Sequence, residues 1–474
     1  MCGLPQAAKD GDVNQSVAIG VEQLDQPLTY PTTAFLSHDY ARAEADRLWA
    51  RVWQHAGRVE EIPDVGDFIT YEIGAESIII LRHASGDDAS AFRAFYNVCP
   101  HRGRRLVDVP KGSNGASGNR RSFVCGFHGW TYGLDGKNCF ILDPQDWKGA
   151  LDEQRTSLSP VHVDHWGGWL FISMDPKAPA LRAWLEPAAG FLDPFQLGRM
   201  RYKWRQWVVF DCNWKTALEA FMEPYHVAGT HPQLLEYGEY YAYSHAHGLH
   251  GVSGFDQRDK AGSMAEGSSV TRAGKGDDPR LSTYELQREI YETVNRASTT
   301  ETLVNAARRL MDELPAGTPA PQVIAHWLAR AKADDAARGV DWPDITPEQM
   351  GRAGLAWNIF PNMAILQGVT FALCYRARPF GEDPDRCIFE SYAIERFPQG
   401  GEPRPGWVEA APAEAGWGKV LAQDFSNMAA VQQGIKSRGF RGPLPNPHQE
   451  RKVTNFHRNL ARYMGTGSPV LLDP

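Results

Sequence analysis

The chain has 474 residues, and its 42% hydrophobic and 22% charged residues are typical of a globular protein. At roughly 150 residues per domain, this length predicts two or three domains. Lys and Arg number 49 and Asp and Glu 57, and the net charge of -8 argues against general nucleic-acid binding. Apolar runs such as Ser77–Leu81 are too short to span a bilayer, and the N-terminal MCGLPQAAKDGD lacks the basic and apolar parts of a secretory signal. We therefore expect a cytoplasmic protein that binds neither nucleic acid nor membrane.

The first half of the chain predicts a short N-terminal segment followed by a small all-β domain. Residues 1–52 begin with a polar tail and continue into a helical pattern around Asp39–Trp53. Residues 53–163 alternate short β-like runs with Gly, Asp and Ser turns. The runs are Phe68–Ile73, Ser77–Arg82, Phe92–Val98 and Ser122–Cys125.

Residues 164–474 predict a larger α+β domain. Strand signals occur at Trp169–Ser173, Tyr202–Phe210, Ala364–Tyr375 and Cys387–Phe397. A helix is expected after Asp211, with Asn213 as its cap. Residues 254–350 are more polar and predict a partly helical insertion, with helices at Leu281–Ala297 and Pro321–Ala337. The C-terminal region is expected to be helical.

Two short motifs, Cys99-Pro100-His101 and Cys125-Gly126-Phe127-His128, each pair a thiolate with an imidazole. Both motifs end β-like runs and lead into loops, so the two loops can converge on one metal centre. Such a donor set admits a structural zinc ion with four tetrahedral ligands. It also admits a Rieske [2Fe-2S] cluster, in which two cysteines bind one iron and two histidines the other. Zinc fingers usually group the cysteines together, whereas here each loop carries one Cys and one His, which favours the cluster.

The seven cysteines are sparse and odd in number, which fits a metal site and reduced thiols better than a disulfide framework. Cys139 is interpreted as a free structural thiol. The seven are Cys2, Cys99, Cys125, Cys139, Cys212, Cys374 and Cys387.

A second group of metal-ligand residues follows the sequence Asn213-Trp214-Lys215. On one helix, Glu219, Glu223 and His226 would share a face at positions i, i+4 and i+7. His231 would point away from a regular helix, so the backbone must distort or end nearby, and Pro224, Gly229 and Pro232 favour such a break. The two imidazoles can then meet at one metal ion.

A mononuclear iron held by two histidines needs a carboxylate to complete a facial triad with open positions for dioxygen. Asp424 is the candidate. It is expected to open a helix, and on spacing alone its alternative role is that of an N-cap.

The sequence resembles the large subunit of Rieske non-haem iron oxygenases, the alpha subunit of the aromatic ring-hydroxylating dioxygenase family. The resemblance rests on WQHAGRVEEIPDVGDF, FYNVCPHRGRRL, CGFHGW, the NWK…EPYH…THP segment, RPFGEDPDRC and QDFSNMAAVQQGIKSRGF. It implies that Asp424 is the third iron ligand, with His226 and His231. It also implies a catalytic domain of the helix-grip type, with an antiparallel sheet and helices.

The resemblance further implies a homotrimer, with or without a small β subunit, in which the cluster of one subunit lies beside the iron of the next. Glu223 would bridge the two centres, so that electrons pass from the cluster through His128 and Glu223 to an iron histidine. Many relatives have Asp at this position. The Glu form is similar to that of some oxygenases of quaternary ammonium compounds.

The function that the resemblance implies is oxygenation of an apolar, aromatic substrate with O2 and electrons from NAD(P)H, delivered by a ferredoxin or reductase. Either cis-dihydroxylation or monohydroxylation fits, as in aromatic hydrocarbon catabolism. The alternative is monooxygenation or demethylation of a non-aromatic or quaternary ammonium substrate. Two other classes are an electron carrier, which would need only the first motif, and a zinc-stabilised binding protein. Residues that can line the substrate pocket, or belong to the core, are Leu218, Phe221, Ile365 and Phe371.

Overall fold

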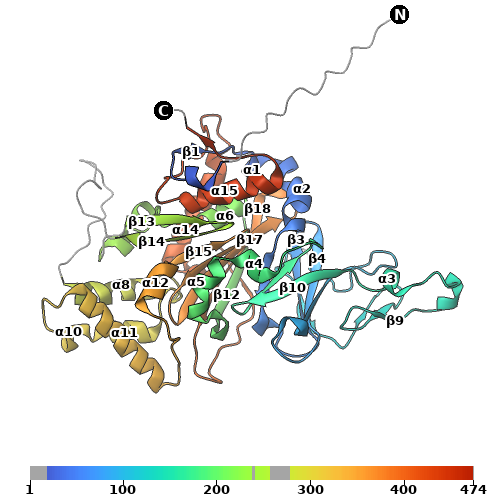
Figure 1. The fold of residues 1–474 in the computed structure, drawn as a ribbon, viewed down its shortest axis with the longest axis horizontal. Coiled ribbons are helices and arrows are strands. Elements are labelled where there is room, and N and C mark those ends of the chain that lie inside the picture. Colours follow the sequence, from blue (N-terminus) through green and yellow to red (C-terminus); the bar gives the residue numbers. More distant parts are fainter. Residues whose placement is uncertain (1–18, 111, 238–240, 257–277, 473–474) are drawn as a thin grey trace, which may run out of the picture.

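The computed structural model describes residues 19–110, 112–237, 241–256 and 278–472. The expectations for the N-terminal tail, Cys2 and residues 257–277 of the insertion lie outside these ranges. Figure 1 shows an elongated molecule, with α3 and β9 at one end of the long axis and α10 and α11 toward the other. Among the helices in the described ranges, none has the length and apolar character needed to cross a membrane.

The smaller β region contains a seven-stranded sheet and a three-stranded sheet, as the β-like runs predict. The larger sheet has the strand order β2-β11-β10-β5-β4-β3-β6, and the smaller sheet has the order β7-β8-β9. The predicted boundary between residues 163 and 164 falls within β10, which pairs with both β5 and β11, and the sheet continues to Ser173. The domain limits stay a prediction. The strands are β2 (Gln54–Arg58), β3 (Asp67–Ile73), β4 (Glu76–Arg82), β5 (Phe92–Tyr96), β6 (Ser117–Asn119), β7 (Phe123–Val124), β8 (Thr131–Tyr132), β9 (Asn138–Phe140), β10 (Pro160–Trp166) and β11 (Trp169–Ser173).

The second region is built on an eight-stranded sheet of order β13-β14-β15-β16-β17-β18-β12-β19. Its neighbouring strands are antiparallel except β12 and β19, so the predicted α+β class with an antiparallel catalytic sheet is confirmed. The single strand predicted at Ala364–Tyr375 is wrong: a turn at Gly368, whose N–H donates to the Phe371 carbonyl at 2.8 Å, divides it into β16 and β17. The strands are β12 (Arg201–Phe210), β13 (Tyr241–His247), β14 (His250–Asp256), β15 (Ala356–Ile359), β16 (Met363–Gln367), β17 (Phe371–Phe380), β18 (Asp383–Glu395) and β19 (Val408–Glu409).

Helices pack on this sheet and position the segments that carry the predicted iron ligands. Helix α6 contacts β17 and β18, α14 contacts α6, and α15 contacts β13 and β14. In the insertion, α8, α9, α10 and α11 pack together, and the predicted helices correspond to α8 and α11. The helices are α1 (Thr33–Leu36), α2 (His38–Arg47), α3 (Glu153–Thr156), α4 (Leu181–Leu185), α5 (Ala188–Leu192), α6 (Trp214–Glu219), α7 (Val227–Thr230), α8 (Pro279–Thr293), α9 (Glu301–Arg308), α10 (Leu310–Glu313), α11 (Ala320–Ala337), α12 (Pro347–Ala353), α13 (Glu414–Trp417), α14 (Lys419–Gly434) and α15 (Arg451–Met464).

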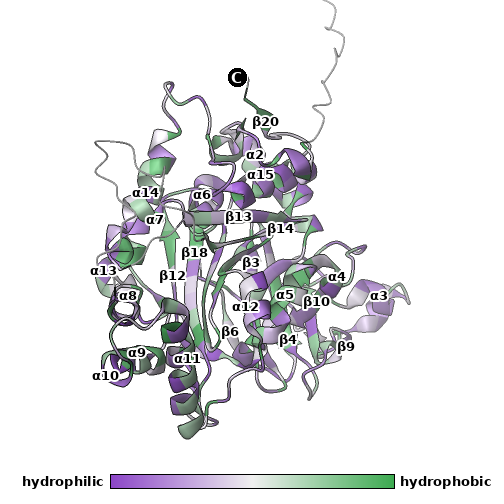
Figure 2. Ribbon diagram, turned by 60° about the vertical axis from the view of Figure 1, so that its left-hand side comes forward, coloured by the Kyte–Doolittle hydropathy of each residue, from purple (hydrophilic) through white to green (hydrophobic). Residues whose placement is uncertain are grey.

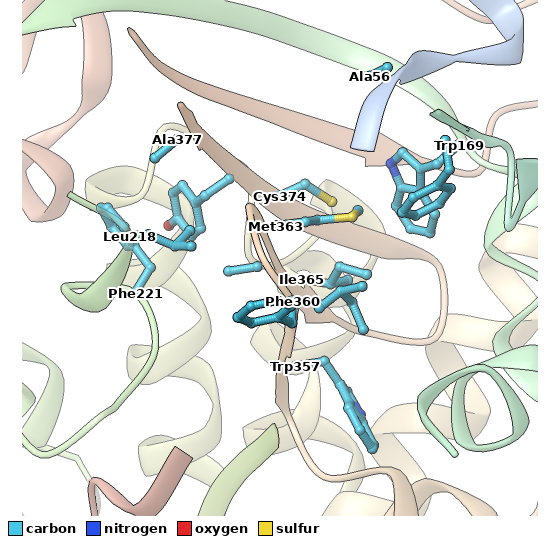
Figure 3. Close-up of a cluster of buried hydrophobic side chains, with 14 of the residues drawn as sticks. Ala56, Trp169, Leu218, Phe221, Trp357, Phe360, Met363, Ile365, Cys374 and Ala377 are labelled. Carbon is cyan, nitrogen blue, oxygen red and sulfur yellow. The ribbon is translucent and has the colours of Figure 1, made fainter. Parts of the chain in front are cut away.

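The main hydrophobic core is shared by the eight-stranded and the seven-stranded sheet. Figure 2 shows apolar colour along strands such as β12 and polar colour on peripheral elements such as α3. Two of the four residues proposed for pocket or core, Leu218 and Ile365, are fully buried core residues. Figure 3 shows Ile365 beside Met363 and Phe360, and Leu218 beside Phe221.

The N-terminal segment is tied to the catalytic region. Strands β1 (Leu28–Thr29) and β20 (Val470–Leu471) pair antiparallel, which joins segments near the two ends of the described chain. Asn213 caps α6 as predicted, because its side chain accepts from the Lys215 N–H. On α2, Glu44 accepts from Lys215 Nζ at 2.6 Å and from Trp214 Nε1 at 3.1 Å, and both charged side chains are almost completely buried. The Asn-Trp-Lys motif is therefore the anchor for α2.

Replacement of Glu44 by alanine should lower the free energy of unfolding by about 3–5 kcal/mol, because it leaves the Lys215 ammonium buried and unpaired. Denaturant titration followed by tryptophan fluorescence measures this loss. Asp39→Ala, which removes an exposed ion pair with Arg42 on the same helix, is the matched control and should change stability little. Equal effects of the two substitutions would contradict the anchoring role of Glu44.

Candidate metal centres

The two Cys/His loops have the same backbone geometry. In the first, the Cys99 N–H donates to Arg104 O at 2.8 Å and the Gly103 N–H to Cys99 O at 3.0 Å. In the second, the Cys125 N–H donates to Trp130 O and the Gly129 N–H to Cys125 O at the same two distances. Gly103 and Gly129 have φ of 75° and 73°, a left-handed conformation that glycine adopts without steric cost. The two loops therefore present their side chains in similar ways.

The side chains of these loops are gathered into one buried group. Cys99 and Cys125 are 1% and 2% exposed, and the His101 and His128 rings lie 4.5 Å apart. The His101 ring also stacks on Trp130 at 4.8 Å. The Nδ1 atoms of both histidines are buried without a hydrogen-bond partner. Such orphaned nitrogens are costly unless a ligand occupies them, so the donor set fits a metal group bound through Nδ1.

The four donors do not surround one ion. Within the described ranges, only His226, His231 and Asp424 form a group of three or more ligand atoms that all lie within 4.8 Å of one another. A tetrahedral zinc site would bring all four donor atoms close together. The wider spacing of this group fits two metal ions better than one, which favours the cluster over zinc.

A tyrosine contacts the cysteine pair. The Tyr132 hydroxyl lies 3.0 Å from Cys99 Sγ, and Tyr132 is fully buried. Burial raises the pKa of the Cys99 thiol, which disfavours an isolated thiolate, whereas a bound cation would offset that cost. With the sulfur deprotonated, the hydroxyl is the donor. Cys139 is an exposed free thiol, as predicted.

The second group of candidate residues does not lie on one continuous helix, so that prediction is wrong. Helix α6 ends at Glu219, Glu223 precedes Pro224, and His226 is the N-cap of α7. Proline cannot continue the hydrogen bonding of a helix, and the chain turns here. This turn brings the carboxylate of Glu223 against His226: it accepts from the backbone N–H at 3.0 Å and contacts Nδ1 at 2.8 Å. The Nε2 atom of His226 is left to face the interior of the site.

Asp424 and His231 complete the group. Asp424 lies inside α14 rather than at its start, so the predicted helix-opening position and the N-cap alternative are wrong. Asp424 Oδ1 is 2.8 Å from His231 Nε2 and 3.6 Å from His226 Nε2. His231 Nδ1 contacts Gln423 Oε1 at 2.9 Å. Each histidine thus has Nδ1 held by a neighbouring oxygen and Nε2 directed at Asp424, an arrangement that orients imidazoles for a metal ion.

The charge of this group favours a cation. His231 and Asp424 are 2% and 4% exposed. Burial disfavours the charged imidazole of His226, but Glu223 and Asp424 outweigh it and raise the pKa of His226 to about 9. The carboxylates of Glu223 and Asp424 therefore favour a positive charge beside them. A divalent ion can supply that charge in place of a proton on His226.

A cavity of about 420 Å³ opens from these residues into the catalytic region. His226, His231 and Asp424 form one part of its wall, and the rest is mainly apolar. Helix α8 of the insertion contributes Leu286 and Ile290, and its C-cap Val294 also lines the cavity, so the insertion covers the cavity. Of the four residues proposed for the pocket or core, Phe221 and Phe371 line the cavity. Burial and, to a lesser extent, Asp424 raise the pKa of Tyr375, which also lines it.

A family model described as ring hydroxylating alpha subunit (catalytic domain) matches residues 197–466, more than half of the chain. The chain belongs to this family. The matched range includes the group of His226, His231 and Asp424. The catalytic domain of this family implies a mononuclear iron site there. A second model, the Rieske [2Fe-2S] domain, matches residues 52–145 and includes both Cys/His loops.

Curated relatives of the alpha subunit cover part of the chain. The glycine betaine monooxygenase oxygenase subunit of Chromohalobacter salexigens is 35% identical over 192 residues, 40% of each chain. The large oxygenase component of the naphthalene 1,2-dioxygenase system of Pseudomonas fluorescens is 33% identical over 202 residues, 41% of this chain and 43% of that one. The aligned parts thus span less than half of these relatives' own length.

A solved quaternary ammonium Rieske monooxygenase in complex with L-carnitine aligns over 96% of this chain and 99% of its own. Its TM-score is 0.60 at 18% identity, which supports the alpha-subunit fold alone.

Sequence reasoning missed two side chains that support the site, Gln423 beside His231 and Glu44 beside Lys215. Gln423 accepts from His231 and also from Gln233 Nε2 at 2.9 Å, and its position next to Asp424 was the only available signal. Glu44 lies 171 positions from its partner Lys215, so no local pattern could reveal it.

Gln423→Leu should weaken metal binding about 10- to 100-fold, because the His231 ring loses the oxygen that fixes its orientation. Iron content after a graded chelator challenge measures this change. Gln433→Leu, on the exposed side of the same helix, is the control. Equal iron retention in the two variants would show that Gln423 does not orient His231.

Proposed function

We propose that this chain is the catalytic subunit of an oxygenase that uses O2 and electrons from NAD(P)H to oxygenate an apolar, aromatic substrate. The observation that carries the proposal is the convergence of His226, His231 and Asp424, all within 4.8 Å, at the end of a mainly apolar cavity. Two imidazoles and one carboxylate leave coordination positions open, as oxygen chemistry requires.

In this proposal, Cys99, His101, Cys125 and His128 hold a [2Fe-2S] cluster, and His226, His231 and Asp424 hold one Fe(II). Bound iron would supply the reduction of dioxygen and the insertion of oxygen. The chain's own side chains have other tasks. Glu223 and Gln423 fix the two imidazoles, and the apolar wall excludes water and positions the substrate.

The overall reaction balances with one NAD(P)H. Dihydroxylation takes substrate, O2, NAD(P)H and one proton to a cis-dihydrodiol and NAD(P)+. Monohydroxylation takes the same reactants to a hydroxylated product, water and NAD(P)+. A separate reductase must accept the hydride and pass on single electrons, directly or through a ferredoxin, because the cluster accepts one electron at a time.

The two proposed metal groups belong to different parts of one chain. β9, near the cluster loops, lies at one end of the molecule, whereas α6 and α14 lie in its body (Figure 1). Large apolar side chains beside the cluster loops are exposed, among them Val124 at 50% and Phe127 at 53%. These features support a homotrimer, with or without a β subunit, in which the cluster of one subunit serves the iron of the next through Glu223.

The cavity favours a neutral, apolar substrate. Across the described part of its wall, no Lys or Arg is present to pair with the carboxylate of a zwitterion such as glycine betaine or carnitine. Aromatic hydrocarbons need no such partner. The second candidate is a quaternary ammonium substrate, which Phe221, Phe371 and Tyr375 could contact with their ring faces.

The decisive experiment is anaerobic purification, reconstitution with a reductase, and a substrate screen that measures product together with oxygen uptake. Stoichiometric uptake with an aromatic hydrocarbon would support the proposal, whereas activity confined to quaternary ammonium compounds would select the second candidate. A colourless protein with zinc and no acid-labile sulfide would overturn both.

A further inference from the structure

Most polar side chains of the cavity wall already have partners. Ser253 Oγ accepts from Lys452 Nζ at 2.8 Å, and Gln287 Oε1 accepts from the Thr299 hydroxyl at 2.5 Å. The Gln367 amide donates to two backbone carbonyls, the closer at 2.8 Å, so its NH2 group is oriented away from any ligand. These contacts hold the three side chains in place, and the Oε1 atom of Gln367 is buried without a partner.

Tyr375 differs from these residues. It lies on β17, where Phe371, Leu373 and Tyr375 alternate onto the same face and all line the cavity. Its side chain is 2% exposed, and its ring stacks on Phe221 with centroids 3.9 Å apart and planes 21° apart. The ring is therefore held in one orientation.

The Tyr375 hydroxyl has no hydrogen-bond partner in the described part of the chain. The buried polar atoms that lack a partner do not include this hydroxyl. Part of its surface is therefore open, and the cavity is the space that it faces. A buried hydroxyl without a protein partner must bind water or a ligand. Tyr375 shares this wall with Asp424, so a ligand bound to the hydroxyl would lie in the same chamber as the metal group.

We propose that Tyr375 is a specificity-determining residue that binds one neutral hydrogen-bonding group, such as a ring N–H or a hydroxyl, on an otherwise apolar substrate. This inference rests on the proposed function and narrows its substrate class. A phenol can accept and donate, so it suits either group. A substrate that replaces the water on the hydroxyl gains a fixed orientation, whereas a pure hydrocarbon displaces that water without compensation.

The test compares indole with indene, two bicyclic molecules of nearly the same shape, of which only indole carries an N–H donor. Dissociation constants for both are measured by calorimetry on the anaerobic holoenzyme and on Tyr375→Phe. The substitution keeps the ring stack and removes only the hydroxyl. We expect the ratio of the indene constant to the indole constant to fall about three- to tenfold, the amount that one net hydrogen bond supplies.

The ratio is taken within each protein, so partial unfolding of the variant leaves it unchanged. Tyr40→Phe, which removes the hydroxyl of a buried tyrosine outside the cavity, is the matched control and should leave the ratio as in the wild type. An unchanged ratio in Tyr375→Phe, or the same fall in Tyr40→Phe, would overturn the assignment. Failure of both probes to bind the wild type would overturn the substrate class.

Turnover with naphthalene separates this inference from the proposed function. Oxidation of naphthalene by the wild type tests the oxygenase proposal alone, because this hydrocarbon forms no hydrogen bond. An unchanged binding ratio in Tyr375→Phe, with naphthalene oxidised by the wild type, would contradict the inference and leave the oxygenase proposal standing. A wild type that binds indole selectively but oxygenates no aromatic compound would contradict the oxygenase proposal instead.

Discussion

Replacement of Asp424 by alanine should reduce product formation at least about a thousandfold, while the visible spectrum of the cluster stays unchanged. Asp424 supplies the only carboxylate in the three-residue group, and its Oδ1 atom lies between the two imidazoles, 2.8 Å and 3.6 Å from their Nε2 atoms. Without it, two neutral histidines would have to hold a divalent ion in a buried site. The Cys/His loops belong to a different part of the chain and should not respond.

Iron and acid-labile sulfide analyses on the same sample distinguish the two centres. We expect the variant to keep its sulfide and to lose about one iron per chain, the mononuclear one. Gln433→Ala, on the exposed side of α14, is the control and should keep full activity. Normal turnover by Asp424→Ala would show that another residue completes the iron site.

Removal of the Glu223 carboxylate should interrupt electron delivery without removing either metal group. Glu223 accepts the backbone N–H of His226 and contacts its Nδ1 atom, so it is in direct contact with a proposed iron ligand. In Glu223→Ala we expect the reoxidation of a reduced cluster, followed by stopped flow in a single turnover with O2 and substrate, to slow about 100-fold. Cluster absorbance and iron content serve as the readouts of intact centres.

Glu223→Asp provides the matched comparison, because it keeps the charge and shortens the side chain by one methylene. Partial recovery of the single-turnover rate in this variant would support a bridging carboxylate. If iron content and rate fell together in Glu223→Ala, the residue would only orient His226, and the proposed route between subunits would have to run through another side chain.

The sequence predicted which side chains come together better than it predicted the backbone conformation around them. The Cys99, His101, Cys125 and His128 motifs are local, and each loop closes on itself by the same pair of hydrogen bonds, so spacing alone was informative. The helix expected through Glu219, Glu223 and His226 was wrong because periodicity does not register how Pro224 redirects the chain.

Contacts between residues that are distant in sequence could not be predicted from local sequence patterns. Asp424 was selected by resemblance, whereas its spacing suggested a helix cap; in the fold it lies within α14 and contacts His231, 193 positions away. Gln423 carries no signal except its neighbour. Two short strands were read as one at Gly368, since alternating hydrophobicity continues on both sides of a tight turn.

The pairing of β1 with β20 limits the order in which parts of the chain can fold during synthesis. Leu28 and its partner Leu471 lie 443 positions apart in the chain. At a synthesis rate of about 5–20 residues per second, Leu471 is made roughly 20–90 seconds after Leu28. Glu44 and Lys215 are both made well before Leu471. Their ion pair can therefore dock α2 on α6 before β1 and β20 pair. The pairing of β1 with β20 then follows the synthesis of every residue proposed to bind metal, so a chain truncated before β20 would carry all of these residues but lack the strand that holds β1.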